Sequence, residues 1–313
     1  MKLVLAPLAG FTDAPFRRMC HEGGADLTYT EMVSAAGLAH GSSPTRHLME
    51  IMPGEGDVAC QIFGARESDI ACATKACTEV RRFCELNLNA GCPMTKVTRE
   101  GAGAKLIENP ETIYRLLKAM VENTDLPVTL KTRLGPHPQK TNIFEIVEAA
   151  EQAGAKGILL HARYTSQMHG GTVHLDILRE VVGRTRLPVT GNGSVVDGRT
   201  LREMSETGVA AVMIGRAALA RPTIFNELKG LESNAGGLAP VRRHLQYLLD
   251  FRRQLADRFP SDHIPSEDGF ASVKMHTHLF RYFNGRPGAA ALRAQLNKVR
   301  TVAEINDIIK NYV

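Results

Sequence analysis

The chain has 313 residues, 43% of them hydrophobic and 23% charged, and a formal net charge of +5. This size can bury a substantial core and allows one large domain with a smaller one. No apolar run approaches the roughly 20 residues that a membrane span needs, and residues 1–7 are too short for a secretory signal. The composition therefore excludes a membrane-spanning protein and predicts a globular protein of the cytoplasm.

Apolar, β-rich runs alternate with amphipathic helical stretches along the first 230 residues. Eight strands are predicted, at residues 3–6, 27–30, 58–63, 84–88, 128–131, 157–161, 189–192 and 211–215. Helices are predicted between them, for example over residues 110–123, where Asn109 is the cap and Pro110 the first helical residue, and over residues 143–153.

Eight βα units in about 230 residues predict a (β/α)₈ TIM barrel, whose chemistry lies at the C-terminal ends of the strands. A doubly wound sheet is the competing α/β fold, but it requires a glycine-rich phosphate turn after an early strand. The segment 101–104 follows no strand, and Gly193 belongs to a segment that comes too late in the chain. The barrel is therefore the predicted fold.

Chemically versatile side chains follow the predicted strands. They are Pro7, Glu31, Gln61, Asn89 with Cys92, Lys131 with Arg133, His161 with Arg163, Asn192, and Gly215 with Arg216. Each alone has an ordinary structural explanation, but together they predict a site at the barrel mouth. Amides and cations without a carboxylate pair suit an anionic cofactor better than hydrolysis.

Cys92 lies between Gly91, which lets another backbone approach closely, and Pro93, which stops the strand. We interpret it as an active-site thiol and not as a buried apolar residue. The six cysteines show no Cys-x-x-Cys pair and no Cys/His grouping with zinc spacing, so neither a metal site nor a disulfide framework is predicted.

The loops after strands 7 and 8 are the usual phosphate site of this fold, and Gly193, Gly215 and Arg216 lie there. Lys131 could stabilise the negative charge of a reduced flavin, and Gln61 could pair with the pyrimidine edge of its ring. FMN is therefore the predicted cofactor.

The ordered motifs resemble those of the tRNA-dihydrouridine synthase family. They are Ala-Pro-Leu-Ala-Gly-Phe-Thr-Asp at 6–13, Glu-Met at 31–32, Gln-Ile-Phe-Gly at 61–64, Asn-Leu-Asn-Ala-Gly-Cys-Pro at 87–93, Gly-Ala-Gly-Ala at 101–104, Lys-Thr-Arg at 131–133, His-Ala-Arg at 161–163, Asn-Gly at 192–193 and Gly-Arg-Ala at 215–217. The resemblance covers essentially the whole chain. It implies reduction of the uracil C5=C6 bond in tRNA by FMN, with NADPH as the electron donor.

The resemblance also implies a role for each site residue. Cys92 is the candidate general acid that protonates C5, because an unperturbed thiol, with a pKa of about 8.5, is mostly protonated at neutral pH. Asn89, Arg133 and Arg163 are assigned to the substrate, with His161 and Arg163 able to contact flavin or a substrate phosphate. Cofactor contacts are assigned to Pro7, Leu8, Ala9, Gln61, Lys131, His161, Asn192, Gly193, Ser194, Gly215 and Arg216. Ser194, Ala162 and Tyr164 depart from the family pattern and affect the ribityl or phosphate details.

The positive charge lies in the last part of the chain. Residues 1–234, the predicted catalytic barrel, hold 26 basic and 26 acidic residues, so residues 235–313 hold 38 − 26 = 12 basic and 33 − 26 = 7 acidic ones. A linker is predicted at 230–240 and a helical tRNA-binding domain at 235–313, with helices from 241 through 255 and from 289 onwards. The stretch 272–282 is similar to the family's RNA-binding helix, which makes Lys274, His278 and Arg281 candidate phosphate contacts.

Two other functions stay open from the sequence. A small-molecule FMN enzyme, such as a dihydroorotate or dihydropyrimidine oxidoreductase, would share the barrel but would not need a basic tail. A non-catalytic RNA-binding protein would make the Cys92, Lys131 and Gln61 set a coincidence. We expect a monomer, and neither the reduced uridine position nor a preference for NADPH over NADH follows from the residues alone.

Overall fold

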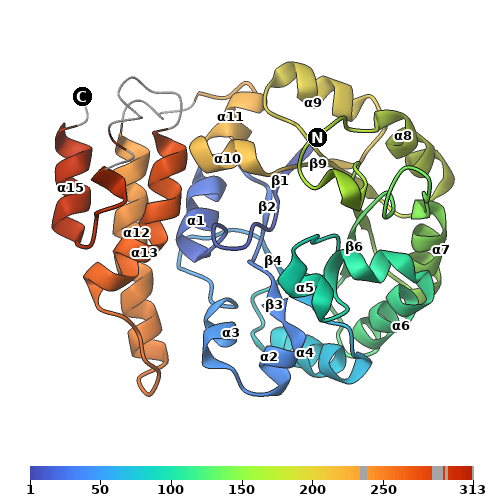
Figure 1. Cartoon of the computed structure of the whole chain (residues 1–313), viewed down its shortest axis with the longest axis horizontal. Coiled ribbons are helices and arrows are strands. Elements are labelled where there is room, and N and C mark those ends of the chain that lie inside the picture. The colour runs from blue at the N-terminus through green and yellow to red at the C-terminus, as the bar shows by residue number, and fades with distance from the viewer. Residues whose placement is uncertain (233–237, 284–291, 293–294, 312–313) are drawn as a thin grey trace.

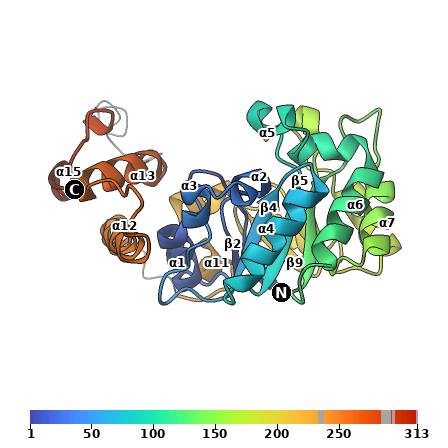
Figure 2. The same cartoon turned by 90° about the horizontal axis from the view of Figure 1, so that it is seen from below.

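The computed structural model of the chain describes residues 1–232, 238–283, 292 and 295–311. A ring of parallel strands surrounded by helices forms one part, and the C-terminal helices lie at its side (Figures 1 and 2). In the described ranges, no helix is both long and apolar enough to cross a membrane.

The strands close into a barrel. They are β1 (Lys2–Leu5), β2 (Leu27–Tyr29), β3 (Val33–Ser34), β4 (Val58–Phe63), β5 (Glu85–Ala90), β6 (Val128–Arg133), β7 (Ile158–His161), β8 (Val189–Asn192) and β9 (Ala211–Ile214). The order is β2-β1-β9-β8-β7-β6-β5-β4-β3, every pair is parallel, and a β2–β4 pairing closes the ring. The predicted eight-stranded TIM barrel is therefore confirmed, and the two-residue β3 is an extra strand beside β4 that its length hid from the sequence pattern.

Helices cover the outside of the barrel (Figure 1). They are α1 (Ala14–Glu22), α2 (Ala35–Ala39), α3 (Ser43–His47), α4 (Glu67–Glu79), α5 (Thr95–Arg99), η1 (Gly103–Glu108), α6 (Pro110–Val121), α7 (Ile143–Ala153), η2 (Thr165–Gln167), α8 (Leu175–Arg184), α9 (Gly198–Ser205), α10 (Arg216–Ala220) and α11 (Ile224–Leu228). The cap predicted for α6 is present, since the Asn109 side chain accepts a hydrogen bond from the Thr112 backbone nitrogen at 3.3 Å. The helix ends at Val121, two residues before the predicted end.

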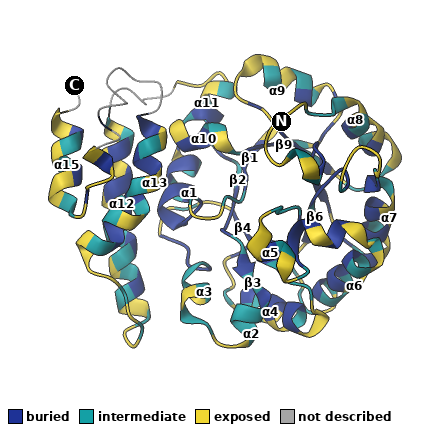
Figure 3. Cartoon of the chain, in the orientation of Figure 1, coloured by how far each residue is buried: buried dark blue, intermediate teal, exposed yellow. Residues whose placement is uncertain are grey.

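The alternation of side chains along β5 separates two environments. Leu86 and Leu88 belong to the apolar layer between strands and helices, and Glu85, Asn87 and Asn89 are polar side chains of the opposite face. Burial follows this layering, with exposed positions on the outer faces of the helices (Figure 3). The barrel interior is thus partly polar, which affects the site above it.

Three described helices follow the barrel: α12 (Ala239–Arg258), α13 (Glu267–Tyr282) and α15 (Val302–Asn311). They share an apolar cluster that also includes Ala14 and Met52 of the barrel, so they are packed against it. The middle of the predicted linker, 233–237, and the predicted helix start at 289 lie outside the described residues.

Candidate active site

A cavity of about 390 Å³ opens at the C-terminal ends of the barrel strands, within the size range of small-molecule sites. The site residues predicted from the sequence that line it are Pro7, Leu8, Ala9, Asn89, Cys92, Lys131, Arg133, His161, Arg216 and Arg281. Those that lie outside its wall are Gln61, Arg163, Asn192, Gly193, Ser194, Gly215, Lys274 and His278. The fold therefore brings residues of five separate strand ends to one cavity.

Cys92 lies two residues beyond β5, on a turn that side chains hold in place. Asn89 Oδ1 accepts hydrogen bonds from the backbone nitrogens of Gly91 at 3.1 Å and Cys92 at 3.0 Å. Arg133 Nε donates to the Gly91 carbonyl at 2.8 Å. Burial raises the pKa of the Cys92 thiol above its ordinary value, against smaller opposing effects of Arg133 and Lys131. The thiol is therefore protonated at neutral pH.

A chain of hydrogen bonds runs through the barrel interior to this turn. Asn89 Nδ2 donates to Gln61 Oε1 at 2.8 Å, Gln61 Nε2 donates to Asn87 Oδ1 at 2.7 Å, and Asn87 Nδ2 donates to Thr129 Oγ1 at 2.8 Å. Thr129 donates in turn to Glu85. Side-chain amides in such a series have both ends occupied, so each fixes the orientation of the next.

This chain changes the interpretation of two predicted contacts. Gln61 is fully buried below the cavity, so in this conformation it supports Asn89 and does not line a flavin site. Asn89 uses its oxygen for two backbone nitrogens and its nitrogen for Gln61 and the sulfur of Met32. These four contacts fill its hydrogen-bonding capacity, so Asn89 orients the Cys92 turn and has no free group for a uracil edge.

Lys131 faces the cavity with its amine held at 3.3 Å from Asn192 Oδ1. Burial, together with the like charge of Arg133, lowers the pKa of Lys131 to about 7. The pKa of Arg133 is lowered by burial to about 10. In the described part of the chain no Asp or Glu side chain lines the cavity, so these cations lack a counterion there. Such a cavity fits an anionic group, as the predicted FMN is.

His161 is neutral in this setting. Its Nε2 lies 3.2 Å from Arg163 Nη1, which can only donate, so the ring proton belongs on Nδ1. Burial lowers the pKa of His161, and the cations Lys131, Arg133 and Arg163 lower it further. A neutral His161 can donate a hydrogen bond without adding charge.

The predicted phosphate segment lies beside the cavity and not in its wall. Gly193 has φ +138° and Ser194 has φ +53°, a conformation that L side chains rarely adopt. Ser194 Oγ accepts from Arg163 Nη2 at 2.7 Å, and Arg163 also donates to the Gly171 carbonyl at 2.8 Å. Arg163 thus ties the loop after β7 to the segment after β8, where an acidic residue was expected in place of Ser194.

The predicted RNA contacts on α13 fall in three different places. Arg281 lines the cavity, with its guanidinium 5.8 Å from the ring centre of Phe11. Lys274 Nζ lies 3.6 Å from Asp13 Oδ2 and 3.7 Å from Glu31 Oε1, so it is engaged by carboxylates. His278 is 1% exposed. A phosphate cannot reach His278 in this conformation, and its prediction as an RNA contact is wrong for this state.

Sequence reasoning missed several cavity residues. They are Ala6, Phe11, Met32, Gly91, Pro93, Met94, Thr132, His169 and Leu219. His169 is the most polar of these: its ring stacks on His161 with centroids 6.4 Å apart, and its carbonyl accepts from Arg216 Nη2 at 2.8 Å. Its position within a long loop carries no periodic signal, although Gly170 and Gly171 after it mark a turn.

Comparison with known proteins gives consistent results. The family model described as "Dihydrouridine synthase (Dus)" matches residues 4–312. The chain is 37% identical over 229 residues to tRNA-dihydrouridine synthase B of Klebsiella pneumoniae, covering 73% of this chain and 71% of that protein. It is 30% identical over 312 residues to the protein of the same name from Pectobacterium carotovorum, covering 99% and 95%.

A third relative, tRNA-dihydrouridine synthase B of Escherichia coli (strain K12), is 36% identical over 260 residues, covering 80% of this chain and 81% of that protein. Among solved structures, FabK from Thermotoga maritima aligns with 14% identity and a TM-score of 0.42 over 70% of this chain and 62% of that chain, and no argument rests on it. The family match and the three relatives span nearly all of the sequence, and we conclude that the chain belongs to the dihydrouridine synthase family of FMN-dependent oxidoreductases.

Proposed function

We propose that this protein reduces the C5=C6 bond of uridines in tRNA, as the names of its relatives state for those proteins. The observation that carries the proposal is a protonated thiol, Cys92, in a cavity lined by cations. Reduction of a C=C bond needs a hydride at one carbon and a proton at the other. A thiol kept protonated by burial suits the second task.

FMN bound against the mouth of the barrel, and itself reduced by NADPH, would supply the hydride to C6 of the uracil. Lys131 and Arg133 would hold its anionic form, because both face the cavity without a carboxylate partner in its described wall. The backbone of residues 7–9 lines the same cavity and offers polar groups to the ring edge. Gly193, Ser194, Gly215 and Arg216 would lie toward the phosphate.

Cys92 would donate its proton to C5 from the opposite side of the base. Asn89 and Arg133 would act through the turn, because they fix the Gly91 and Cys92 backbone and so set the direction of the thiol. Because only the protonated thiol donates, activity should hold below the raised pKa of Cys92 and fall as the pH rises through it.

The C-terminal helices would bind the tRNA outside the cavity. Arg281 supports this, since a residue of α13 reaches the cavity that holds Cys92. A uridine in folded RNA must leave its stack to reach the barrel mouth, at a cost of a few kcal/mol, so binding area beyond the cavity is required. We further propose that the protein acts as a monomer in the cytoplasm, with residues 1–234 as the catalytic unit and 235–313 as the RNA-binding unit.

The test uses tRNA free of dihydrouridine, incubated with FMN-loaded protein and NADPH and analysed for dihydrouridine by mass spectrometry. Cys92→Ala should lower the rate by about 10²–10⁴-fold without loss of bound flavin. Cys72→Ala, which changes an exposed cysteine on α4, is the matched control and should behave as the wild type. NADPH oxidation with free pyrimidines but none with tRNA would instead identify a small-molecule enzyme.

A further inference from the structure

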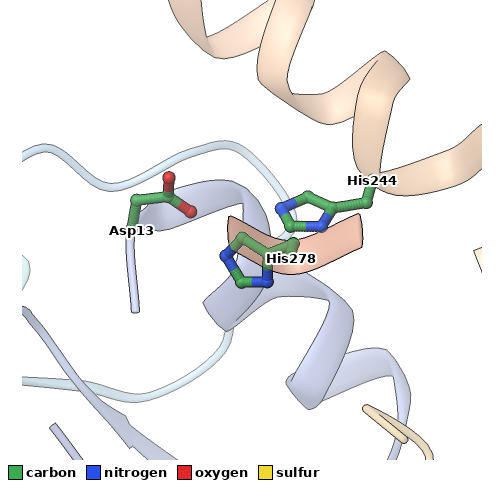
Figure 4. Close-up of side chains that lie close together, drawn as sticks. All are labelled: Asp13, His244 and His278. Carbon is green, nitrogen blue, oxygen red and sulfur yellow. The ribbon is translucent and has the colours of Figure 1, made fainter. Parts of the chain in front are cut away.

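Three side chains of the metal-ligand type meet where the C-terminal helices pack on the barrel. Asp13, His244 and His278 each offer one ligand atom, and these atoms all lie within 4.8 Å of one another (Figure 4). Asp13 precedes α1, His244 lies in α12 and His278 in α13. All three are buried, with exposed fractions of 6%, 0% and 1%.

The hydrogen bonds of His244 leave one ring nitrogen available. Its Nδ1 lies 3.0 Å from the Tyr282 hydroxyl oxygen, and that hydroxyl donates to Met19 Sδ at 3.8 Å. The Tyr282 oxygen therefore accepts the Nδ1 proton, which places a lone pair on Nε2. Among the described residues Nε2 has no hydrogen-bond partner. Metal-bound histidines commonly have their other ring nitrogen held by an oxygen in this way.

His278 is less satisfied still. Neither of its ring nitrogens has a hydrogen-bond partner within the described ranges. The ring is enclosed by aromatic neighbours: it lies edge-on to His244 with centroids 4.4 Å apart and packs on Phe16 at 4.8 Å. Burying a polar group without a partner is unfavourable, and nearly all such groups in native proteins are paired. Two unpartnered histidines beside one carboxylate point to a group that is bound between them.

Charge and protonation are compatible with a cation. Burial lowers the pKa of His244 well below its ordinary value and that of His278 to about 4, so both rings are neutral near pH 7 and keep a lone pair. The Lys274 ammonium is the nearby positive charge, and it contacts both Asp13 and Glu31. Two carboxylates against one ammonium leave a net charge of −1 before any ion binds. Asp13 also lines a cavity of about 170 Å³, which offers access for an ion and water.

We propose that Asp13, His244 and His278 bind a divalent transition-metal ion of the zinc class, which fastens the C-terminal helices to the barrel. Two imidazole nitrogens and one carboxylate oxygen suit such ions, whereas Ca²⁺ and Mg²⁺ prefer oxygen ligands. With bonds of about 2.0–2.1 Å, tetrahedral zinc holds its ligand atoms about 3.4 Å apart. The three side chains therefore draw closer together on binding, and water completes the coordination.

The competing explanation is a pair of neutral, uncharged histidines that merely fill space between helices. Zinc content separates the two. FMN-loaded, full-length protein is stripped with a chelator, dialysed against Zn²⁺ and then against metal-free buffer, and its zinc is measured by mass spectrometry. We expect about one ion per chain in the wild type. His276→Gln, two residues away on α13, is the matched control and should retain the ion.

Asp13→Asn and His244→Gln should each lower bound zinc at least tenfold. Asn caps helices as well as Asp does, so Asp13→Asn keeps the start of α1 and removes mainly the charge. Zinc should raise the melting temperature of the wild type and of His276→Gln, and leave that of Asp13→Asn unchanged, because an ion that binds the folded state stabilises it. A wild type without stoichiometric zinc, or an Asp13→Asn protein that binds zinc as the wild type does, would overturn the proposal.

Discussion

The buried amine of Lys131 makes a quantitative prediction for cofactor binding. Its pKa is lowered to about 7 by burial and by the neighbouring Arg133. At pH 8 it therefore carries about 0.1 proton in the flavin-free protein, by the ordinary titration relation. An anionic flavin against the amine should move its pKa back toward the usual value of about 10.4. Each flavin bound at pH 8 should then take up about 0.9 proton.

The pH dependence has a definite sign. The bound state has the higher pKa, so FMN affinity should be greatest below about pH 7 and fall by up to about tenfold per pH unit above it. The phosphate group has a second pKa near 6 and is already dianionic at pH 8, so it contributes little to the uptake. At pH 6 the amine is already protonated and its contribution should nearly vanish.

Isothermal titration calorimetry of flavin-free protein with FMN at pH 8, in buffers of different ionisation enthalpy, measures this uptake as a slope. Lys131→Arg is the matched control: it keeps a cation that is charged throughout this range, so its uptake should be near zero even where FMN still binds. A wild-type uptake below about 0.2 proton, or an equal uptake in the Arg variant, would refute the assignment of Lys131 to the anion.

Three further predictions test the supports of the site. Gln61→Leu removes the acceptor for Asn89 and should lower the free energy of unfolding by about 1–3 kcal/mol in urea titrations; an unchanged value would contradict the hydrogen-bond chain. Arg17→Met leaves Glu55, 2.8 Å from the Arg17 Nε, as a buried unpaired charge and should cost about 3–5 kcal/mol, with partial recovery on adding Glu55→Gln; equal stability of single and double variants would argue against the pair. Arg281→Gln should weaken tRNA binding and reduce its logarithmic salt slope by about 1 without changing flavin affinity, as filter binding at several salt concentrations would show; an unchanged slope would mean that Arg281 meets no phosphate.

The sequence was sufficient for the barrel and for most of the cavity wall. Strands buried on both faces read as short apolar runs, and parallel strands all deliver their C-terminal ends to one edge. Residues that follow the strands, such as Cys92, Lys131 and His161, could therefore be grouped without knowing any distance. The small errors lie at element ends, where α6 stops at Val121, and in β3, which is too short to show a period.

What the tertiary structure decided is which of these groups are free. Gln61 and Asn89 both follow the pattern of ligand-binding amides, yet their hydrogen bonds are used within the barrel. A sequence shows that an amide stands at a strand end and not whether a neighbouring strand already occupies it.

The C-terminal helices show the same division. Their charge and periodicity follow from the sequence, but which face of α13 meets the barrel does not. His278 looked like a phosphate contact and is instead buried beside Asp13 and His244, residues distant in the chain. Local spacing reveals ligand sets carried by one loop or helix, whereas a set assembled from three elements exists only once those elements have packed. Side-chain type and strand position are local properties, and the pairing of buried polar groups is a property of the folded chain alone.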